Sequence, residues 1–349
     1  MKVGLIGFSS SGKTTVYNAL TGQRAEIGYA SRGSGKTNLG VVKVPDPRVD
    51  ALSAIHSPKK ITLAEIMFVD VAAPPGAGAR SFDSSALPAM REVEALVQVV
   101  RAFPTEDGTA ADPVGELADL QSELTIGDLQ PIEKRLERLK REKGKPGEVE
   151  LLNKLKDHLE SGKPLRDMAL SEQDLTNISG YRFLTLKPLL IVINVAESDA
   201  GKPLPESVTK YAAEHKLTLI PLSGKLEMDI AELAPDEQKA FLADLGLAEP
   251  ALGRFVRAAY SALELISFLT AGPDECRAWT IKRGTSAHRA AGKIHSDIER
   301  GFIRAEVMTF EDFMNFKSEA KVREAGKARL EGKEYIVRDG DIIHFRHNS

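Results

Sequence analysis

Apolar residues are distributed along the chain in short runs that predict buried strands with helices between them. A run of this length, bounded by turn residues, is typical of a strand that is covered on both faces. The runs are residues 2–7, 61–71, 188–195 and 219–222. After the first run, Val16, Ala19 and Leu20 begin a helical stripe. The pattern predicts an α/β fold with a mainly parallel sheet, in which ligands bind at the carboxyl ends of the strands.

A charged stretch at residues 115–163 interrupts this alternation and predicts two antiparallel helices that form a coiled-coil arm. Apolar side chains recur at helical spacing on both sides of "REKGKPGEVE" (141–150), whose glycines and proline suit a hairpin tip. The apolar positions are Ile132, Leu136, Leu139, Leu152, Leu155 and Leu159. From Glu133 to Lys145 there are seven Lys or Arg against three Glu. This charge predicts either a solvated helix face or a contact surface for RNA or a partner.

The last part of the chain, residues 265–349, is predicted to be rich in strands. Alternation in "KEYIVRDGDIIHFR" (333–346) predicts two short strands around a turn at Asp339-Gly340. A helix is expected over residues 255–269, before this part. From Arg277 to Arg304 seven Lys or Arg stand against two acidic residues, with Trp279 among them. A basic face with an aromatic residue suits contact with RNA or a ribosome, although such charge can also be without function.

Composition narrows the class of protein. The 349 residues predict two or three domains, and 42% hydrophobic and 28% charged residues are ordinary for a globular protein. The net charge of −3 indicates that any nucleic-acid contact depends on a local patch. A single cysteine, Cys276, excludes an internal disulfide framework. No apolar run reaches the roughly 18 residues that span a bilayer, so we expect a cytoplasmic protein without a membrane partner.

The strongest motif is "GFSSSGKT" at residues 7–14, which matches G-x-x-x-x-G-K-[ST] between a strand and a helix. Gly7 and Gly12 allow a tight turn whose N–H groups point at phosphates, and the following helix adds its positive end. Lys13 is the candidate catalytic residue because its ammonium reaches the β- and γ-phosphates. The candidate phosphate-binding residues are Ser9, Ser10, Ser11, Gly12, Lys13, Thr14 and Thr15.

A magnesium site is predicted beside this loop. The Thr14 hydroxyl can ligate Mg²⁺ directly. "ITLAEIMFVDV" (61–71) ends its apolar run in Asp70, where a carboxylate is expected to hold the ion through water. Asp70 at a strand end is also compatible with a plain turn residue.

A second motif predicts which base the site binds. "LLIVINVAESD" (189–199) places Asn194 at a strand end, where P-loop GTPases have Asn-Lys-x-Asp and the Asp binds guanine. Here Val195 replaces the Lys and the longer Glu197 replaces the Asp, which disfavours guanine because the pocket loses its paired acceptor. Alternatively, Asn194 and Glu197 only shape the loop. In "LIPLSGKLEMDIAEL" (219–233), Ser223 and Gly224 are expected to approach the base with their backbone amides.

Together these residues resemble the Obg-like ATPases of the YchF type, nearly from end to end. The resemblance includes "NLGVVKVPDPRVD" (38–50), "REVEALVQVVRAF" (91–103), "NVAE" (194–197) and "AGPDECRAWTIKRGT" (271–285). It implies a P-loop protein of the GTPase class that prefers ATP through Asn-x-x-Glu, with Val195 beside adenine through its backbone. It also implies that the C-terminal part is a ubiquitin-like TGS domain.

Three departures from the family pattern concern hydrolysis. The hydroxyl that ligates Mg²⁺ from the first switch falls on Ser34, four residues before Asn38, with Thr37 nearby. In the second switch Ala73 replaces a glycine and is followed by two prolines, Pro74 and Pro75, which stiffen the segment and donate no hydrogen bond. No histidine lies between residues 56 and 158, where relatives often carry one for positioning water. We therefore expect ATP binding with slow hydrolysis.

The sequence thus predicts a GTPase-like P-loop domain at 1–114 and 164–262, an inserted helical arm at 115–163 and a TGS domain at 265–349. The predicted function is an ATP-binding, slowly hydrolysing switch, monomeric, that acts on the ribosome or a partner in translation or stress. A non-hydrolysing ATP-dependent scaffold that binds RNA or the ribosome is the alternative, and a GTPase is a further one. Mg²⁺ is the expected cofactor.

Overall fold

The structure, a computed structural model, describes residues 1–23, 38–70, 87–105, 108–142, 144, 146–247 and 249–348. The chain divides into two compact units. The P-loop unit comprises Lys2–Val41 and Met67–Phe255, and the C-terminal unit comprises Met1, Val42–Ile66 and Val256–Ser349. Segment 42–66, which the sequence placed with the P-loop domain, is grouped with the C-terminal residues. The predicted three-domain boundaries stay predictions.

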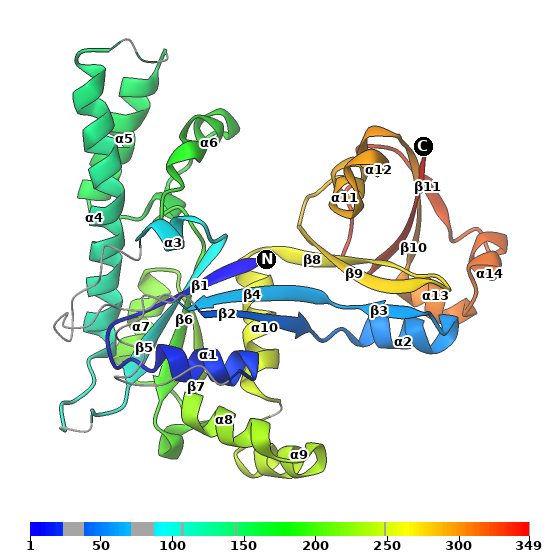
Figure 1. Cartoon of the computed structure of the whole chain (residues 1–349), viewed down its shortest axis with the longest axis horizontal. Coiled ribbons are helices and arrows are strands. Elements are labelled where there is room, and N and C mark those ends of the chain that lie inside the picture. The colour runs from blue at the N-terminus through cyan, green and yellow to red at the C-terminus, as the bar shows by residue number, and fades with distance from the viewer. Residues whose placement is uncertain are drawn as a thin grey trace. The chain divides into compact units, whose positions relative to one another are not determined.

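A six-stranded sheet carries the P-loop (Figure 1). Its order is β2-β4-β1-β5-β6-β7, and β1 pairs in parallel with β4 and β5, β5 with β6, and β6 with β7. The strands are β1 (Lys2–Ile6), β2 (Asn38–Val44), β4 (Ala64–Asp70), β5 (Ala95–Ala102), β6 (Leu189–Val195) and β7 (Thr218–Leu222). The predicted mainly parallel sheet is confirmed, although the run 61–71 contains two strands, β4 and the shorter β3 (Lys60–Thr62).

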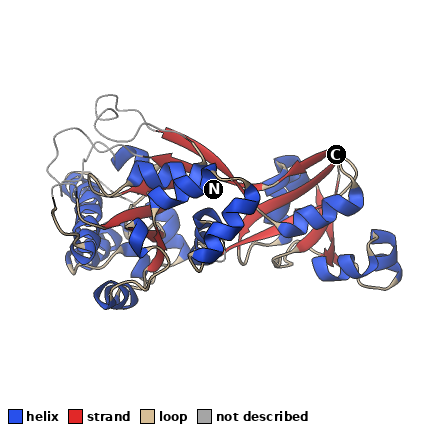
Figure 2. Cartoon of the chain, turned by 90° about the horizontal axis from the view of Figure 1, so that it is seen from below, coloured by secondary structure: helices blue, strands red, loops and turns tan. Residues whose placement is uncertain are grey.

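Helices lie on both sides of these strands (Figure 2). On one face Val16, Tyr17 and Leu20 of α1 are buried, and α1 packs against α8. On the other face, buried leucines of α4 join a cluster with Ile6 and Phe8. The helices that follow β1 are α1 (Lys13–Thr21), α3 (Leu87–Arg91), α4 (Pro113–Leu139), α5 (Glu148–Glu160), η3 (Leu165–Asp167), α6 (Glu172–Ile178), η4 (Ser179–Tyr181), η5 (Glu197–Asp199), α7 (Glu206–Glu214), α8 (Gly224–Glu232), α9 (Pro235–Asp244) and α10 (Ala251–Ala262).

Helices α4 and α5 lie side by side, as the apolar spacing predicts (Figure 1). The Asp112 side chain caps α4 by accepting a hydrogen bond from the Gly115 N–H. Ile132 of α4 is buried in one cluster with Leu152, Leu155 and Leu159 of α5. The two predicted helices are therefore confirmed, and their mutual packing is the expected apolar seam.

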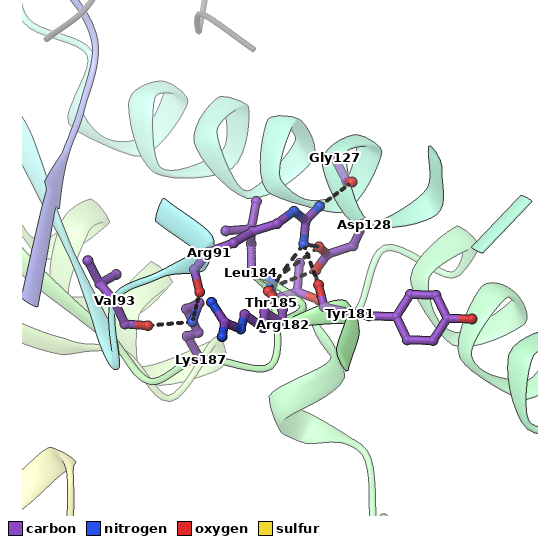
Figure 3. Close-up of polar contacts among 9 residues, drawn as sticks. All are labelled: Arg91, Val93, Gly127, Asp128, Tyr181, Arg182, Leu184, Thr185 and Lys187. Carbon is purple, nitrogen blue, oxygen red and sulfur yellow. Dashed lines mark hydrogen bonds and ion pairs between the residues drawn. The ribbon is translucent and has the colours of Figure 1, made fainter. Parts of the chain in front are cut away.

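A proline inside α4 creates an attachment point for the segment before β5. Pro131 has no N–H, so the carbonyl of Gly127, four residues earlier, lacks its helical donor. The Arg91 guanidinium supplies one, with Nη2 2.8 Å from the Gly127 oxygen (Figure 3). Arg91 ends α3, and α3 begins at the first described residue after the predicted second switch. The Gly127 carbonyl that Pro131 leaves without a helical donor thus binds Arg91 and attaches that segment to α4.

The fully buried Asp128 of α4 is the centre of the contacts that attach this segment. Its Oδ1 accepts hydrogen bonds from Arg91 Nη1 at 3.0 Å and the Leu184 N–H at 2.9 Å. Its Oδ2 accepts from the Thr185 N–H at 2.7 Å and the Thr185 hydroxyl at 2.8 Å. In Figure 3 these donors converge on one carboxylate, with Lys187 bonded to the carbonyls of Arg91 and Val93. We call the cluster of Arg91, Asp128 and Thr185 the arm joint.

The C-terminal unit is built on a second sheet of order β11-β10-β12-β8-β9-β3. Pairing is parallel between β12 and β8 and between β3 and β9, and antiparallel elsewhere. Small residues of α11, namely Ala287, Ala290 and Ala291, pack into its core. Its elements are α2 (Pro47–His56), β3, β8 (Leu265–Thr270), β9 (Glu275–Lys282), α11 (Ala287–Ile294), α12 (Ser296–Arg300), β10 (Phe302–Thr309), α13 (Phe310–Phe316), α14 (Glu319–Glu324), β11 (Arg329–Glu331) and β12 (Asp341–His347).

Two expectations for this unit are wrong. The predicted hairpin at 333–346 is absent, because β12 already has β10 and β8 as its two neighbours and leaves no edge for the preceding residues. Ile336 makes only an isolated bridge to Ser286. The predicted helix at 255–269 ends at Ala262, since Glu264 adopts a positive φ of 50° and the largely buried run after it forms β8. Among the described residues no helix is both long and apolar enough to cross a membrane.

The arm joint gives a stability prediction. Asp128→Asn removes the charge of a fully buried, ion-paired carboxylate and replaces one of its accepting oxygens by an NH₂ group that faces other donors. We expect the free energy of unfolding to fall by about 3–5 kcal/mol. We expect the melting midpoint in calorimetry to fall by roughly 6 °C or more. Asp157→Asn on α5 is the matched control, because the Asp157 side chain is exposed. Equal melting of the two variants would contradict a structural role for the joint.

Candidate functional site

The phosphate loop is fixed by close backbone approaches at its two glycines. A Cβ at Gly7 would lie 2.4 Å from the Val99 carbonyl oxygen. A Cβ at Gly12 would lie 2.2 Å from Asn194 Nδ2, and Gly12 also has a left-handed φ of 83°. The Ser11 N–H donates to the Phe8 oxygen within the loop. Both glycines are therefore required by space as well as by backbone conformation.

Lys13 opens helix α1 and lies against the loop. Its Nζ donates to the carbonyl oxygens of Gly7 at 2.9 Å and Phe8 at 3.4 Å. Burial lowers the pKa of the Lys13 ammonium, and the negative charges of Asp70 and Glu116 oppose that shift. An ammonium held against the carbonyls of this loop, at the N-terminus of a helix, is suited to binding an anion.

The Asn194 side chain links the phosphate loop to the loop after β7. Its Nδ2 donates to the Ser11 carbonyl oxygen at 3.0 Å. Its Oδ1 accepts from the Gly224 N–H at 2.9 Å. Asn194 is 4% exposed, so both hydrogen bonds are shielded from water. One amide therefore sets the spacing between two loops that are more than two hundred residues apart in sequence.

Val195 and Glu197 face different surroundings. The Val195 side chain packs in a core cluster with Val100 and Ile193, which leaves only its backbone for a ligand. Glu197 begins η5 and is partly exposed, and its Oε1 lies 2.6 Å from Lys225 Nζ of α8. Hydrogen bonding to Glu197 raises the pKa of Lys225. The loop after β6 thus presents a backbone segment and an ion pair.

The residues predicted to bind magnesium lie together where they are described. Thr14 Oγ1 donates to Asp70 Oδ2 at 3.3 Å, and Asn38 Nδ2 donates to the same oxygen at 3.1 Å. Asp70 is 3% exposed, and its Oδ1 has no hydrogen-bond partner among the described residues. A buried, unsatisfied carboxylate oxygen beside a threonine hydroxyl fits a cation held mainly by phosphates and water. The described residues contain no cluster of three His, Cys, Asp or Glu that would hold a metal alone.

Several predicted residues occupy the same neighbourhood with lesser contacts. Ser10 adopts a positive φ of 62° at the tip of the loop, and Ser223 is buried at the start of α8. A Cβ at Gly224 would lie 3.3 Å from atoms of Thr15, which shows how closely α8 approaches α1. Ser9 lies in the turn of the loop. Ser34, Thr37, Ala73, Pro74 and Pro75 lie outside the described residues.

Two polar contacts of the site were not anticipated from the sequence. Asn38 served there only as a landmark for Ser34, yet its amide orients Asp70. Glu116, near the start of α4, is buried and accepts a hydrogen bond from the Arg101 N–H. A polar residue opening an otherwise alternating strand was the available signal for Asn38. No sequence pattern marked Glu116.

Two family models match parts of this chain. A family model described as a 50S ribosome-binding GTPase matches residues 2–154. A model for the C-terminal region of YchF GTPases, described as a protein of unknown function, matches residues 265–348.

Full-length relatives are similar over nearly the whole chain. The ribosome-binding ATPase YchF of Haemophilus influenzae is 40% identical and that of Bacillus subtilis 39%, over 99% and 100% of this chain and 99% of each relative. The structure of the Schizosaccharomyces pombe YchF GTPase superposes with a TM-score of 0.82 at 30% identity, over 99% of this chain and 97% of the other. The fold is therefore the mixed α/β P-loop fold of GTPases.

The Asn194 link gives a prediction that needs no ligand. Asn194→Asp keeps the acceptor for Gly224 but sets a carboxylate oxygen against the Ser11 carbonyl, which should cost about 1–3 kcal/mol. Hydrogen exchange in residues 9–14 is expected to quicken. Asn153→Asp, exposed on α5, serves as the control. Unchanged exchange in the Asn194 variant would show that the link does not hold the loop.

Proposed function

The chain belongs to the YchF family of ribosome-binding ATPases, and from this premise we propose that it binds ATP, hydrolyses it slowly and acts on the ribosome. The observation that carries the proposal is the Asn194 amide, which joins a complete phosphate loop to the predicted base-binding loops. The names of the relatives differ in their nucleotide, since curated ones are called ATPases and the solved structure a GTPase. The choice of base is therefore argued from side chains.

Adenine is the proposed base. Guanine presents N1–H and N2–H₂ as paired donors, which need a carboxylate with two free oxygens. Glu197 has one oxygen on Lys225, and the Val195 side chain is in the core. A pocket of this kind gives guanine no matching acceptor pair, whereas the Val195 backbone can contact adenine. The proposed nucleotide-binding residues are Ser9, Ser10, Ser11, Gly12, Lys13, Thr14, Thr15, Asn194, Val195, Glu197, Ser223 and Gly224.

Magnesium is the proposed cofactor. Thr14, Asp70 and Ser34 would hold it beside the phosphates, where the ion supplies charge neutralisation between the β- and γ-phosphate oxygens. The unsatisfied Asp70 Oδ1 supports this assignment for the described pair. Asn38 would keep the carboxylate oriented by its hydrogen bond to Oδ2.

Hydrolysis is proposed to be slow. Lys13 and the loop N–H groups can stabilise negative charge on the transferred phosphoryl group. The sequence provides no histidine between residues 56 and 158 to orient the attacking water, and Ala73 replaces the glycine whose amide would meet the γ-phosphate. Catalysis then depends on electrostatic stabilisation alone, which favours a switch with a long-lived ATP state.

The arm joint is suited to transmitting the change between the ATP-bound and ADP-bound states to α4. Arg91 ends α3, which begins at the first described residue after the predicted second switch, and it bonds to Gly127 and Asp128 of α4. A conformational change in the second switch would therefore be transmitted through Arg91 to α4, the first helix of the coiled-coil arm. Beyond the joint Lys134 and Arg138 share one face of α4 by spacing, and Arg141 follows in the turn after the helix. All three are exposed and have no ion-pair partner among the described residues. We propose this stripe as a contact for ribosomal RNA.

The C-terminal unit is proposed to include a ubiquitin-like TGS domain. Parallel neighbours β8 and β12 at the centre of a mixed sheet, with α11 packed on it, are the arrangement that such domains share. Most of its basic residues between 277 and 304 are exposed, which suits RNA. Trp279 is less suited to stacking on a base, because Arg277 covers its ring at 3.7 Å and its Nε1 donates to Thr270. We further propose a monomer that works in the cytoplasm.

Removal of the Lys13 charge tests the enzyme directly. Lys13→Ala is expected to lower ATP hydrolysis by about a hundredfold or more, because a main stabiliser of the transferred phosphoryl group is lost. Phosphate release with ATP and Mg²⁺ gives the measurement. Wild-type protein that releases no more phosphate than the variant would leave only a non-hydrolysing scaffold.

The basic stripe gives a binding prediction. Replacing Lys134, Arg138 and Arg141 together by Gln should weaken ribosome co-sedimentation and flatten its salt dependence, because fewer phosphate contacts release fewer counterions. The control replaces the exposed Lys154, Lys210 and Lys216 by Gln. Equal loss in both triple variants would point to overall charge and not to this stripe.

A further inference from the structure

The ion pair between Glu197 and Lys225 joins two loops that the structure holds in fixed positions. Glu197 follows β6 by two residues and Lys225 follows β7 by three, so both lie at the carboxyl edge of the sheet. Their side chains meet with Nζ 2.6 Å from Oε1. Asn194, three residues before Glu197, bonds to the N–H of Gly224, which directly precedes Lys225. The pair therefore spans two backbones that are already tied together.

The pair is exposed, so its contribution to folding is small. The Lys225 side chain is 72% exposed and the Glu197 side chain 45%. Exposed ion pairs add little to stability because water screens them and both side chains lose freedom. The pair is better suited to selecting a ligand. A nucleotide base bound beside it would displace part of the water and strengthen the attraction between Glu197 and Lys225.

The chemistry of the pair discriminates between bases. A carboxylate that accepts from guanine N1–H and N2–H₂ uses both oxygens, but one oxygen of Glu197 faces an ammonium. Guanine would have to displace Lys225 or donate only one of the two hydrogen bonds, and either outcome weakens its binding. Adenine has no such pair of donors and is not penalised.

We propose that Lys225 is a specificity-determining positioning residue, whose ammonium keeps Glu197 from serving as the guanine acceptor. The inference rests on the proposed function, because it concerns the base-binding end of the same site. It assigns the rejection of GTP to the ion pair and not to the length of Glu197 alone.

The test compares ATP and GTP binding in the full chain by calorimetry with Mg²⁺. Lys225→Met keeps the aliphatic stem and removes the charge, and it is expected to shift the ratio of the two Kd values toward GTP by about tenfold. Lys225→Arg keeps a cation and should retain the wild-type ratio. Lys202→Met is the matched control, because Lys202 forms a similar exposed pair with Asp199 of the same η5 turn.

A double-variant cycle separates this role from a general structural one. In a Glu197→Gln background, Lys225→Met should leave the ratio unchanged, since there is no carboxylate to hold. An unchanged ratio in Lys225→Met, with wild-type protein still preferring ATP, would overturn the inference and leave the proposed function standing. Wild-type protein that binds neither nucleotide, or that prefers GTP, would overturn both.

Discussion

The site depends on one buried amide. Asn194 donates to the phosphate loop and accepts from the start of α8, so a single side chain links the phosphate loop to the loop after β7. The close approach of Gly12 to this amide explains why that glycine admits no side chain. Because the Asn194 oxygen and one of its N–H groups bond within the protein, we propose that its neighbours decide the choice of base. Those neighbours are the Val195 backbone and the Glu197–Lys225 pair.

A second buried polar centre attaches other segments of the chain to α4. Asp128 accepts hydrogen bonds from two parts of the chain, Arg91 and residues 184–185, and Pro131 leaves free the Gly127 carbonyl that Arg91 binds. Arg91 ends α3, which begins at the first described residue after the predicted second switch. The unit therefore has buried polar links at the phosphate loop and in the middle of α4, and we propose that the second link transmits a change in the switch to the helices.

The sequence predicted the parts of the molecule that local patterns specify. "GFSSSGKT" between a strand and a helix was sufficient for the phosphate loop, and leucine spacing was sufficient for α4 and α5. Contacts between distant segments were not predictable in this way, because nothing near Asn38 points to Asp70 and nothing near Arg91 points to Pro131. The residues at 333–338 alternate like a strand, but β12 has both edges taken by β10 and β8. Whether such residues form a strand depends on the pairing available in the folded protein and not on their local sequence preference.

We propose that the two halves of the site form one preassembled cradle for ATP. A crystal structure with Mg²⁺ and a non-hydrolysable ATP analogue tests this proposal most directly. We expect phosphates on the N–H groups of residues 9–14, adenine against the Val195 backbone, and Asn194 still bonded to Ser11 and Gly224. Adenine bound elsewhere, or an Asn194 amide withdrawn from Ser11, would contradict it.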